Sequence, residues 1–155
     1  MDDFADMLAP EAVLASLAVP NKKTLFQQLA GVASRVTGVE TKTIVDRLVE
    51  RERLGSTGFG GGIAIPHGKI DGIDHVVGVF ARLATPVDFQ AIDDMPVDIV
   101  FLLLSSPHAG VEHLKALARV SRRLRDRNFV AKLRGAATPD ALYALFVQAD
   151  TRDAA

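Results

Sequence analysis

The amino-acid sequence predicts a single α/β domain in which helices cover a mostly buried central β-sheet. Two observations lead to this fold class. Along the chain, segments with apolar residues at helical spacing alternate with short apolar runs that are typical of strands. The run at 97–104 is apolar almost throughout, which predicts a strand buried on both faces. The length of 155 residues and the 48% hydrophobic content suit one domain with a sizeable core.

Two helices are expected in the first third of the chain. Apolar side chains recur at helical intervals at 24–37, and Gly38 suits the end of that helix. Thr41 can cap a second helix that runs to about Arg53. A turn rich in glycine follows this helix and allows the backbone to change direction sharply.

A short buried strand, 63–65, is expected directly after the glycine turn. Pro66 should end this strand because proline cannot donate a hydrogen bond to a sheet ladder. His67 is therefore expected at a strand end, on a rigid mount between Pro66 and Gly68. That setting suits chemistry more than packing.

The second half of the chain continues the alternation of strands and helices. The expected elements are a turn at 71–74, a strand at 75–83, a loop at 85–96 with one extended patch at 87–89, the buried strand at 97–104, and helices at 111–125, 128–133 and 138–147. Residues 1–150 should form the domain, and residues 151–155 are expected to be a frayed tail.

Composition excludes several classes of protein. The chain has no cysteine, which rules out disulfides, cysteine–zinc sites and thiol nucleophiles. A net charge of −1 gives no general attraction to nucleic acid or membrane. The acidic N-terminus does not resemble a signal peptide, and the longest apolar run, 99–104, is far too short to span a bilayer. We therefore expect a soluble, cytoplasmic protein without membrane insertion.

Four histidines are candidates for chemistry: His67, His75, His108 and His113. The segment after the buried 97–104 strand places His113 in the first turn of a helix, where it can approach a second strand end such as that of His67. His75 and His108 are expected to be structural or exposed. No histidines have the spacing of a zinc-binding HExxH helix, so neither a metal site nor a cofactor is predicted. The GxSxG elbow of serine hydrolases and the phosphate-binding P-loop are also absent.

A histidine nucleophile is the chemistry that remains. A neutral imidazole can attack a phosphoryl group with one nitrogen if an acceptor holds the N–H of the other. Phosphoryl transfer then depends on positioning and on donors around the new phosphate. Arg51 closes the helix that leads into the glycine turn, so it is a plausible donor.

The segment 55–69, GSTGFGGGIAIPHGK, closely resembles the active-site segment of the phosphotransferase-system enzyme IIA proteins of the mannitol/fructose class, and is most like their nitrogen-related regulatory branch. The segments ERERLGSTG, PVDFQAIDDMPVDIVFLLLSSP and EHLKALARVSRRL follow the family's order, so the resemblance covers most of the chain. It implies an α/β domain with a central mixed sheet. The nitrogen-related proteins often have Ile-Gly-Asn-Gly where this chain has FGGG at 59–62.

The resemblance also implies roles for individual residues. His67 would be the phosphoacceptor, His113 would hydrogen-bond the phosphoryl group and Arg51 would help to bind it. We expect Ser56 and Thr57 to stabilise the turn, with a phosphate contact as their alternative role. Phe59, Ile63 and Ile65 are expected to border a shallow hydrophobic patch around His67 that suits a docking carrier. A cluster of five arginines between 119 and 127 has no interleaved aromatic residues, which argues against nucleic-acid binding.

The implied function is that of a regulatory phosphocarrier. It would accept a phosphoryl group from a phosphohistidine carrier of the HPr type and regulate other proteins through its phosphorylation state. The family's targets include potassium-transport regulators, sensor kinases and stringent-response enzymes. Two alternatives remain open: a sugar-specific enzyme IIA that passes the group to the IIB component of a permease, and a binding module whose His67 is never phosphorylated.

Overall fold

The computed structural model describes the backbone of residues 4–154 and the side chains of residues 4–148. Its centre is a six-stranded mixed sheet, which confirms the predicted fold class. The strand order is β1-β5-β6-β3-β2, and β4 also pairs with β6. The strands are β1 (Leu8–Leu17), β2 (Gly58–Gly60), β3 (Ile63–Ala64), β4 (His67–Lys69), β5 (Val77–Val87) and β6 (Val97–Ser105).

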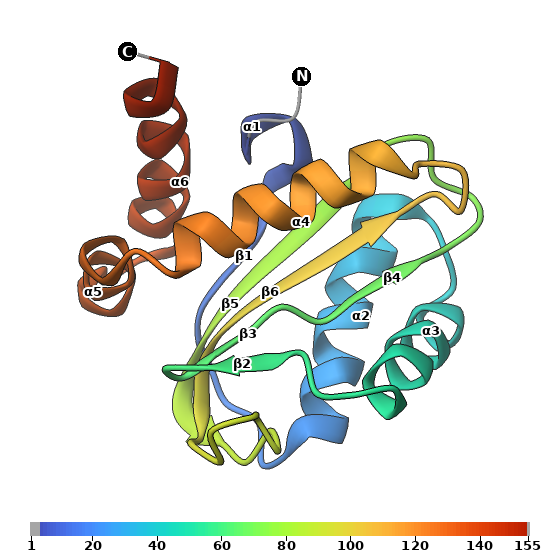
Figure 1. Ribbon diagram of the computed structural model, residues 1–155, viewed down its shortest axis with the longest axis horizontal. Helices are drawn as coiled ribbons and strands as arrows, with labels where there is room; N and C mark the ends of the chain where they lie inside the picture. Colours follow the sequence, from blue (N-terminus) through green and yellow to red (C-terminus); the bar gives the residue numbers. More distant parts are fainter. Residues whose placement is uncertain (1–3, 155) are drawn as a thin grey trace.

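Helices cover both faces of this sheet. Figure 1 shows α2 and α3 on one side, and α4, α5 and α6 towards the other. The helices are α1 (Phe4–Met7), α2 (Lys22–Thr37), α3 (Thr41–Arg53), α4 (Val111–Leu124), α5 (Arg127–Gly135) and α6 (Pro139–Ala154). The last helix thus continues to Ala154, beyond the expected end near Val147 and through most of the segment predicted to be frayed. Ala155 lies outside the described residues.

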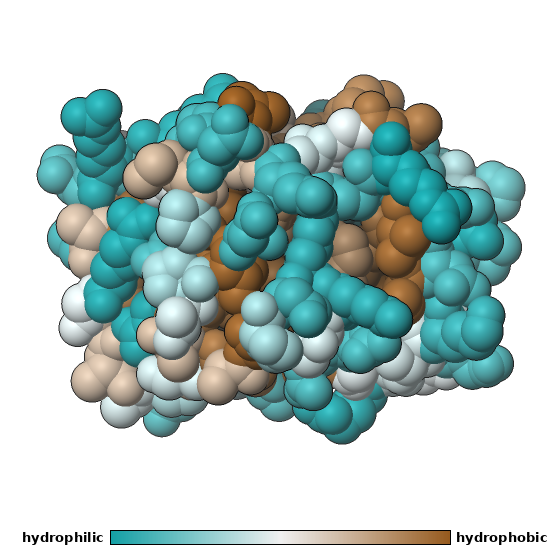
Figure 2. Space-filling model, turned by 90° about the horizontal axis from the view of Figure 1, so that it is seen from below, coloured by the Kyte–Doolittle hydropathy of each residue, from teal (hydrophilic) through white to brown (hydrophobic). Residues whose placement is uncertain are grey.

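The core is built around β6, as its apolar sequence predicts. Ile99 to Leu104 are fully buried, and β6 pairs antiparallel with β5 on one side and parallel with β3 and β4 on the other. Phe80 on β5 and Phe101 on β6 pack against Phe146 of α6, with ring centroids 5.0 and 5.7 Å from that of Phe146. The face seen from below is mostly polar, with separate hydrophobic patches between hydrophilic side chains (Figure 2).

Helix ends follow local capping, with two corrections. Asn21 accepts a hydrogen bond from the Thr24 amide at 2.8 Å, so α2 begins two residues before the predicted start. Gly38 ends α2 in the left-handed conformation (φ 78°), as predicted. Thr41 was expected to cap α3, but it is the first helical residue and no side chain caps that helix. Asp126 caps α5, which begins one residue before its predicted start.

Strand β1 is the main element that the sequence did not predict. It is an edge strand that pairs only with β5, in parallel. Pro10 is tolerated there because an edge strand has one unpaired side. Buried and exposed residues do not alternate regularly along β1, and several of its residues are alanines. The sequence therefore lacks the alternation of apolar and polar side chains by which strands are recognised.

Strand β3 ends at Ala64, before Pro66, as expected, but strand pairing resumes at His67, which the sequence did not predict. Ile63–Ala64 and His67–Lys69 are both parallel to β6, and the Pro66 carbonyl accepts a hydrogen bond from the Leu103 amide at 2.9 Å. Proline lacks only the donor, so the chain is interrupted there and then resumes its course along β6. His67 therefore opens β4 instead of closing a strand.

Candidate active site

Two histidines from distant parts of the sequence lie beside each other at one edge of the sheet. His67 opens β4 and faces Leu103 of β6 across the parallel ladder. Strand β6 ends at Ser105, and the chain then returns through a short loop into α4, whose first turn carries His113. The ring centroids of His67 and His113 are 5.7 Å apart. This edge, at the carboxyl ends of parallel strands, is where open α/β sheets commonly bind ligands.

Both ring nitrogens of His67 are held by hydrogen bonds, and together these define its tautomer. Nδ1 lies 2.9 Å from the carbonyl oxygen of Ile65, and the Arg51 Nε–H group donates to Nε2 at 3.2 Å. A carbonyl can only accept and a guanidinium can only donate, so the proton is on Nδ1 and the lone pair on Nε2. The nitrogen that is free to attack is therefore Nε2.

The surroundings keep the His67 ring neutral. Burial is the main cause that lowers its pKa from the ordinary value of 6.5, and the positive charge of Arg51 lowers it further. The hydrogen bond to Ile65 and the negative charge of Glu52 act in the opposite direction. Since the net shift is downward, the neutral, nucleophilic ring predominates at neutral pH.

The guanidinium of Arg51 is held by a backbone carbonyl as well as by His67. It lies in the last turn of α3, and its Nη1 donates to the carbonyl of Gly55 at 3.0 Å. A guanidinium held at one end by a backbone carbonyl presents its remaining donors in a defined direction. The side chain can therefore meet an anion at Nε2 of His67 with little reorganisation.

His113 is held by a residue that the sequence analysis did not select. Its Nδ1 is hydrogen-bonded to the hydroxyl of Ser105, and both side chains are buried. Burial is the main cause that lowers the pKa of His113; His67, when protonated, and the positive charge of Lys69 lower it further. The only signal for this contact is a serine closing an apolar strand eight residues before a histidine, which is weak without the fold.

Ser56 and Thr57 make local contacts in the turn. The Ser56 hydroxyl accepts from the Gly58 amide at 3.1 Å. The Thr57 hydroxyl donates to the Glu52 carboxylate at 2.6 Å, and the Thr57 amide donates to the same group at 3.0 Å. These bonds tie the turn to the end of α3, which favours the turn-stabilising role over a phosphate contact.

A shallow cavity of about 430 Å³ lies over the two histidines. Leu54 forms part of its wall and is 84% exposed. Val111 and Leu114, which flank His113 in α4, are also largely exposed. The cavity is lined by Arg47, Glu50, Arg51, Leu54, His67, Gly68, Lys69 and His113.

The hydrophobic patch predicted from the sequence was placed on the wrong residues. Ile63 and Ile65 are buried in the core. Phe59 lines a different cavity, where the guanidinium of Arg125 lies 5.4 Å from its ring centroid. The segment 63–65 runs beside the mostly buried strand β6 and is buried throughout, so the exposed apolar residues beside the site come from the helix ends instead.

Comparison with known proteins agrees with this geometry. Residues 6–149 match the family model described as "Phosphoenolpyruvate-dependent sugar phosphotransferase system, EIIA 2". The chain belongs to this family. That confirms the resemblance seen in the sequence.

Among relatives of this EIIA chain, a "Nitrogen regulatory protein" of Bradyrhizobium diazoefficiens is 46% identical over 142 residues, covering 92% of this chain and 93% of the relative. One of the same name from Pseudomonas aeruginosa is 39% identical, covering 91% and 92% of the two chains. The crystal structure of nitrogen regulatory protein IIA-Ntr from Neisseria meningitidis superposes with a TM-score of 0.86 at 30% identity, covering 91% of this chain and 97% of that one.

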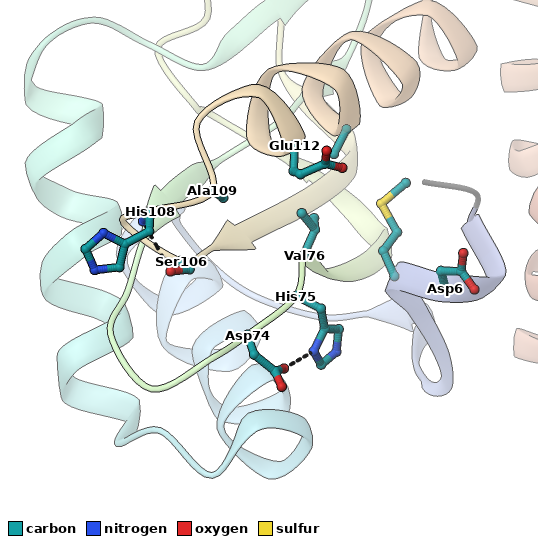
Figure 3. Close-up of a pocket in the computed structure, with 10 residues that line it drawn as sticks. Asp6, Asp74, His75, Val76, Ser106, His108, Ala109 and Glu112 are labelled. Atoms are coloured by element: carbon teal, nitrogen blue, oxygen red, sulfur yellow. Dashed lines mark hydrogen bonds and ion pairs between the residues drawn. The ribbon is translucent and has the colours of Figure 1, made fainter. Parts of the chain in front are cut away.

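The two remaining histidines of this EIIA chain lie at a separate cavity of about 530 Å³ (Figure 3). His75 is exposed and pairs with Asp74, with 2.7 Å between Nδ1 and the carboxylate. His108 is also exposed. Within the described residues, no three acidic or histidine side chains gather as a metal site would require, and no helix is long and apolar enough to cross a membrane.

Proposed function

We propose that this EIIA protein is a regulatory phosphocarrier that accepts a phosphoryl group on Nε2 of His67. The observation that carries the proposal is the pair of hydrogen bonds to His67. Ile65 holds the proton on Nδ1, and Arg51 contacts the lone pair on Nε2. A nucleophile with a fixed tautomer next to a cation is what transfer of an anionic group requires.

The transfer balances without a cofactor. The N–P bond of an incoming phosphohistidine breaks as the bond between phosphorus and Nε2 of His67 forms. The carrier's imidazole leaves with the electron pair of the broken bond. His67 keeps its proton on Nδ1, where the Ile65 carbonyl stabilises the positive charge that the ring acquires.

Arg51 and His113 are suited to hold the transferred group. Arg51 is already within hydrogen-bond distance of the attacking nitrogen. In the proposed arrangement the Ser105 hydroxyl donates to Nδ1 of His113, which leaves the single N–H proton of the neutral ring on Nε2 for the phosphoryl oxygens. One positive charge and one neutral N–H donor would together stabilise the phosphoryl group, which carries nearly two negative charges.

The donor is proposed to be a carrier of the HPr type, itself phosphorylated from phosphoenolpyruvate. The exposed side chains Leu54, Val111 and Leu114 provide the apolar part of a docking surface around the cavity. Lys69 adds positive charge at its edge, whereas the charge of Arg47 is paired with Glu50, 2.9 Å away. A small apolar centre with a polar rim suits a weak complex that forms and dissociates quickly. We further infer that the exchange takes place in the cytoplasm.

Regulation would follow from the same surface. Phosphorylation adds nearly two negative charges to a cavity flanked by exposed apolar residues. A partner that docks through apolar contact will reject the charged form, and one that offers arginines will prefer it. The named relatives, all called nitrogen regulatory proteins at high coverage, support regulation as the biological role.

Transfer to a sugar permease is the second candidate. A relative named "PTS system fructose-specific EIIA component", from Haloferax volcanii, is 40% identical over 57% of this chain. In that role this chain would use the same His67, and only the acceptor of its phosphoryl group would differ. Incubation of the phosphorylated protein with a purified IIB domain separates the two, because only a sugar-specific protein should lose its phosphoryl group rapidly to that domain.

The test is intact-protein mass spectrometry after incubation with phosphoenolpyruvate, the first enzyme of the system and its HPr-like carrier. We expect one acid-labile phosphoryl group on the wild type and none on His67→Ala. His75→Ala is the matched control, since His75 is exposed and lines a separate cavity, and it should be labelled like the wild type. An unlabelled wild type in the presence of phosphorylated carrier would refute the proposal and leave the binding-module alternative.

A further inference from the structure

Thr57 is connected, through other residues, to both of the groups that hydrogen-bond His67. It follows the last turn of α3 and precedes β2, and its side chain is buried. One chain of contacts runs from it towards Nε2 of His67 and another towards Nδ1.

The contact chain towards Nε2 passes through the turn at the end of α3. The Gly55 carbonyl accepts from Nη1 of Arg51 at 3.0 Å, and the same guanidinium donates from Nε to His67. Gly55 has a φ of 151° and lies two residues before Thr57, so its carbonyl direction depends on how the turn is closed. The Glu52–Thr57 hydrogen bonds close that turn.

The contact chain towards Nδ1 passes through the backbone of the next strand. The Thr57 carbonyl accepts a hydrogen bond from the Ile65 amide at 3.1 Å. The Ile65 carbonyl is in turn the acceptor for Nδ1 of His67 at 2.9 Å. A shift of Thr57 would therefore move the group that selects the tautomer of the histidine.

Thr57 is itself held by a nearly buried carboxylate. Glu52 has only 9% of its side chain exposed and receives both the hydroxyl and the amide hydrogen of Thr57. Its charge is compensated by Lys22 of α2, whose Nζ lies 2.7 Å from Oε2. Lys22 also donates to the Phe89 carbonyl at 2.9 Å, which anchors it to the loop after β5. A charge buried to this extent needs such partners.

We propose that Thr57 and Glu52 are positioning residues for phosphoryl transfer at His67, and that Lys22 braces Glu52. The inference rests on the proposed function of His67 as phosphoacceptor. It adds that the reactivity of His67 depends on a clamp, Lys22–Glu52–Thr57, that never touches the phosphoryl group. The clamp acts on both ring nitrogens, through Arg51 on one side and Ile65 on the other.

The clamp also acts through charge. The carboxylate of Glu52 raises the pKa of His67, opposing burial and Arg51. Glu52→Gln keeps an oxygen that can accept from Thr57 but removes that charge, so the pKa of His67 should fall further. A residue that only stabilised the turn would not move the titration of a histidine in another strand.

The experiment compares Thr57→Val, Thr57→Ser, Glu52→Gln and Lys22→Met with the wild type. Initial rates of phosphorylation are measured at varied concentrations of phosphorylated HPr-like carrier. Thr57→Val keeps the size of the side chain but loses the hydroxyl. A misplacement of the reacting group by about 1 Å can lower a reaction rate on the order of 10²-fold. We expect the rate at saturating carrier to fall by roughly 10- to 100-fold with little change in KM. Thr57→Ser, which restores the hydroxyl, should recover most of it.

Controls on the same helix separate positioning from general damage. Thr43→Val and Asp46→Asn change an exposed threonine and an exposed ion pair of α3, and both should leave the rate unchanged. If Thr57→Val does not fold, Glu52→Gln and Lys22→Met carry the test. Wild-type rates in folded Thr57→Val or Glu52→Gln protein would overturn the proposal.

A readout without phosphorylation keeps this inference separate from the proposed function. ¹⁵N NMR of the His67 ring reports its tautomer and pKa in the unphosphorylated protein. Thr57→Val should increase the fraction of the other tautomer, and Glu52→Gln should lower the pKa. An unlabelled wild type would refute the phosphocarrier role alone, whereas an unchanged His67 spectrum in both variants would refute the clamp.

Discussion

Replacing Arg51 by methionine tests how the site stabilises the transferred group. Methionine keeps much of the side chain's length and apolar contact but removes the guanidinium that lies 3.2 Å from Nε2 of His67. The group that arrives at that nitrogen brings nearly two negative charges. Loss of one preorganised donor to such a charge typically lowers a rate by about 10²–10³, or about 3–4 kcal/mol in the barrier. We expect Arg51→Met to slow phosphorylation of His67 by that factor.

The same variant should change the pH dependence in a defined direction. The positive charge of Arg51 lowers the pKa of His67, so removing it raises that pKa. Only the neutral ring attacks, and the rate therefore falls as the pH drops through the pKa of His67. In the wild type this fall should occur below pH 6.5, because the net shift is downward. In Arg51→Met it should occur at a higher pH than in the wild type.

The assay is the initial rate of phosphoryl transfer from phosphorylated carrier between about pH 5 and pH 8, with an NMR titration of the His67 ring in parallel. Arg53→Met is the matched control, because Arg53 lies in the same last turn of α3, is exposed and does not line the cavity over the histidines. A rate for Arg51→Met within about threefold of the wild type would refute the electrostatic reasoning. So would a downward shift of the His67 pKa.

Three further outcomes are expected. His113→Ala should leave His67 able to accept a phosphoryl group but slow the transfer by about 10²-fold, as shown by rapid-quench labelling; unchanged kinetics would remove His113 from the site. Gly62→Ala should lower the free energy of unfolding in urea by at least about 1–2 kcal/mol, because Gly62 has a φ of 83° and an added Cβ would lie 2.7 Å from a guanidinium nitrogen of Arg134. Gly31→Ala is the control: an added Cβ at this position in α2 meets nothing within 4 Å, so the free energy of unfolding should rise by up to about 1 kcal/mol. Phe101→Ala should cost about 3–5 kcal/mol by the same measurement, and a loss below about 1 kcal/mol would contradict the packing of the aromatic core.

Elements with a strong local signal were predictable from the sequence. Strand β6 was expected at 97–104 and is found at Val97–Ser105, because an almost continuous apolar run has few alternatives to full burial. Helix α2 ends at Gly38 as expected, since a left-handed C-cap is a local preference of glycine. Strand β1 was missed because an edge strand with alanines and a proline is defined by its partner β5 and carries little pattern of its own.

For the candidate site, too, the sequence pointed to the residues but did not show how they are arranged in space. The segment around His67 and the helix start at His113 identify the family and point to the candidate residues, because the proposed chemistry needs these side chains whatever surrounds them. Their closeness, 5.7 Å between ring centroids, arises only when β4 and β6 run parallel and α4 returns over their ends.

The sequence by itself determined the fold class and the family, and it selected the candidate histidines, since these depend on local patterns and on a motif. The tertiary structure decided which nitrogen of His67 carries the lone pair, which side chain orients His113 and which residues surround the cavity. These properties depend on single hydrogen bonds between segments far apart in the chain, such as the bond from Arg51 to His67. Local preferences do not encode such bonds, because they form only once the sheet has brought the segments together.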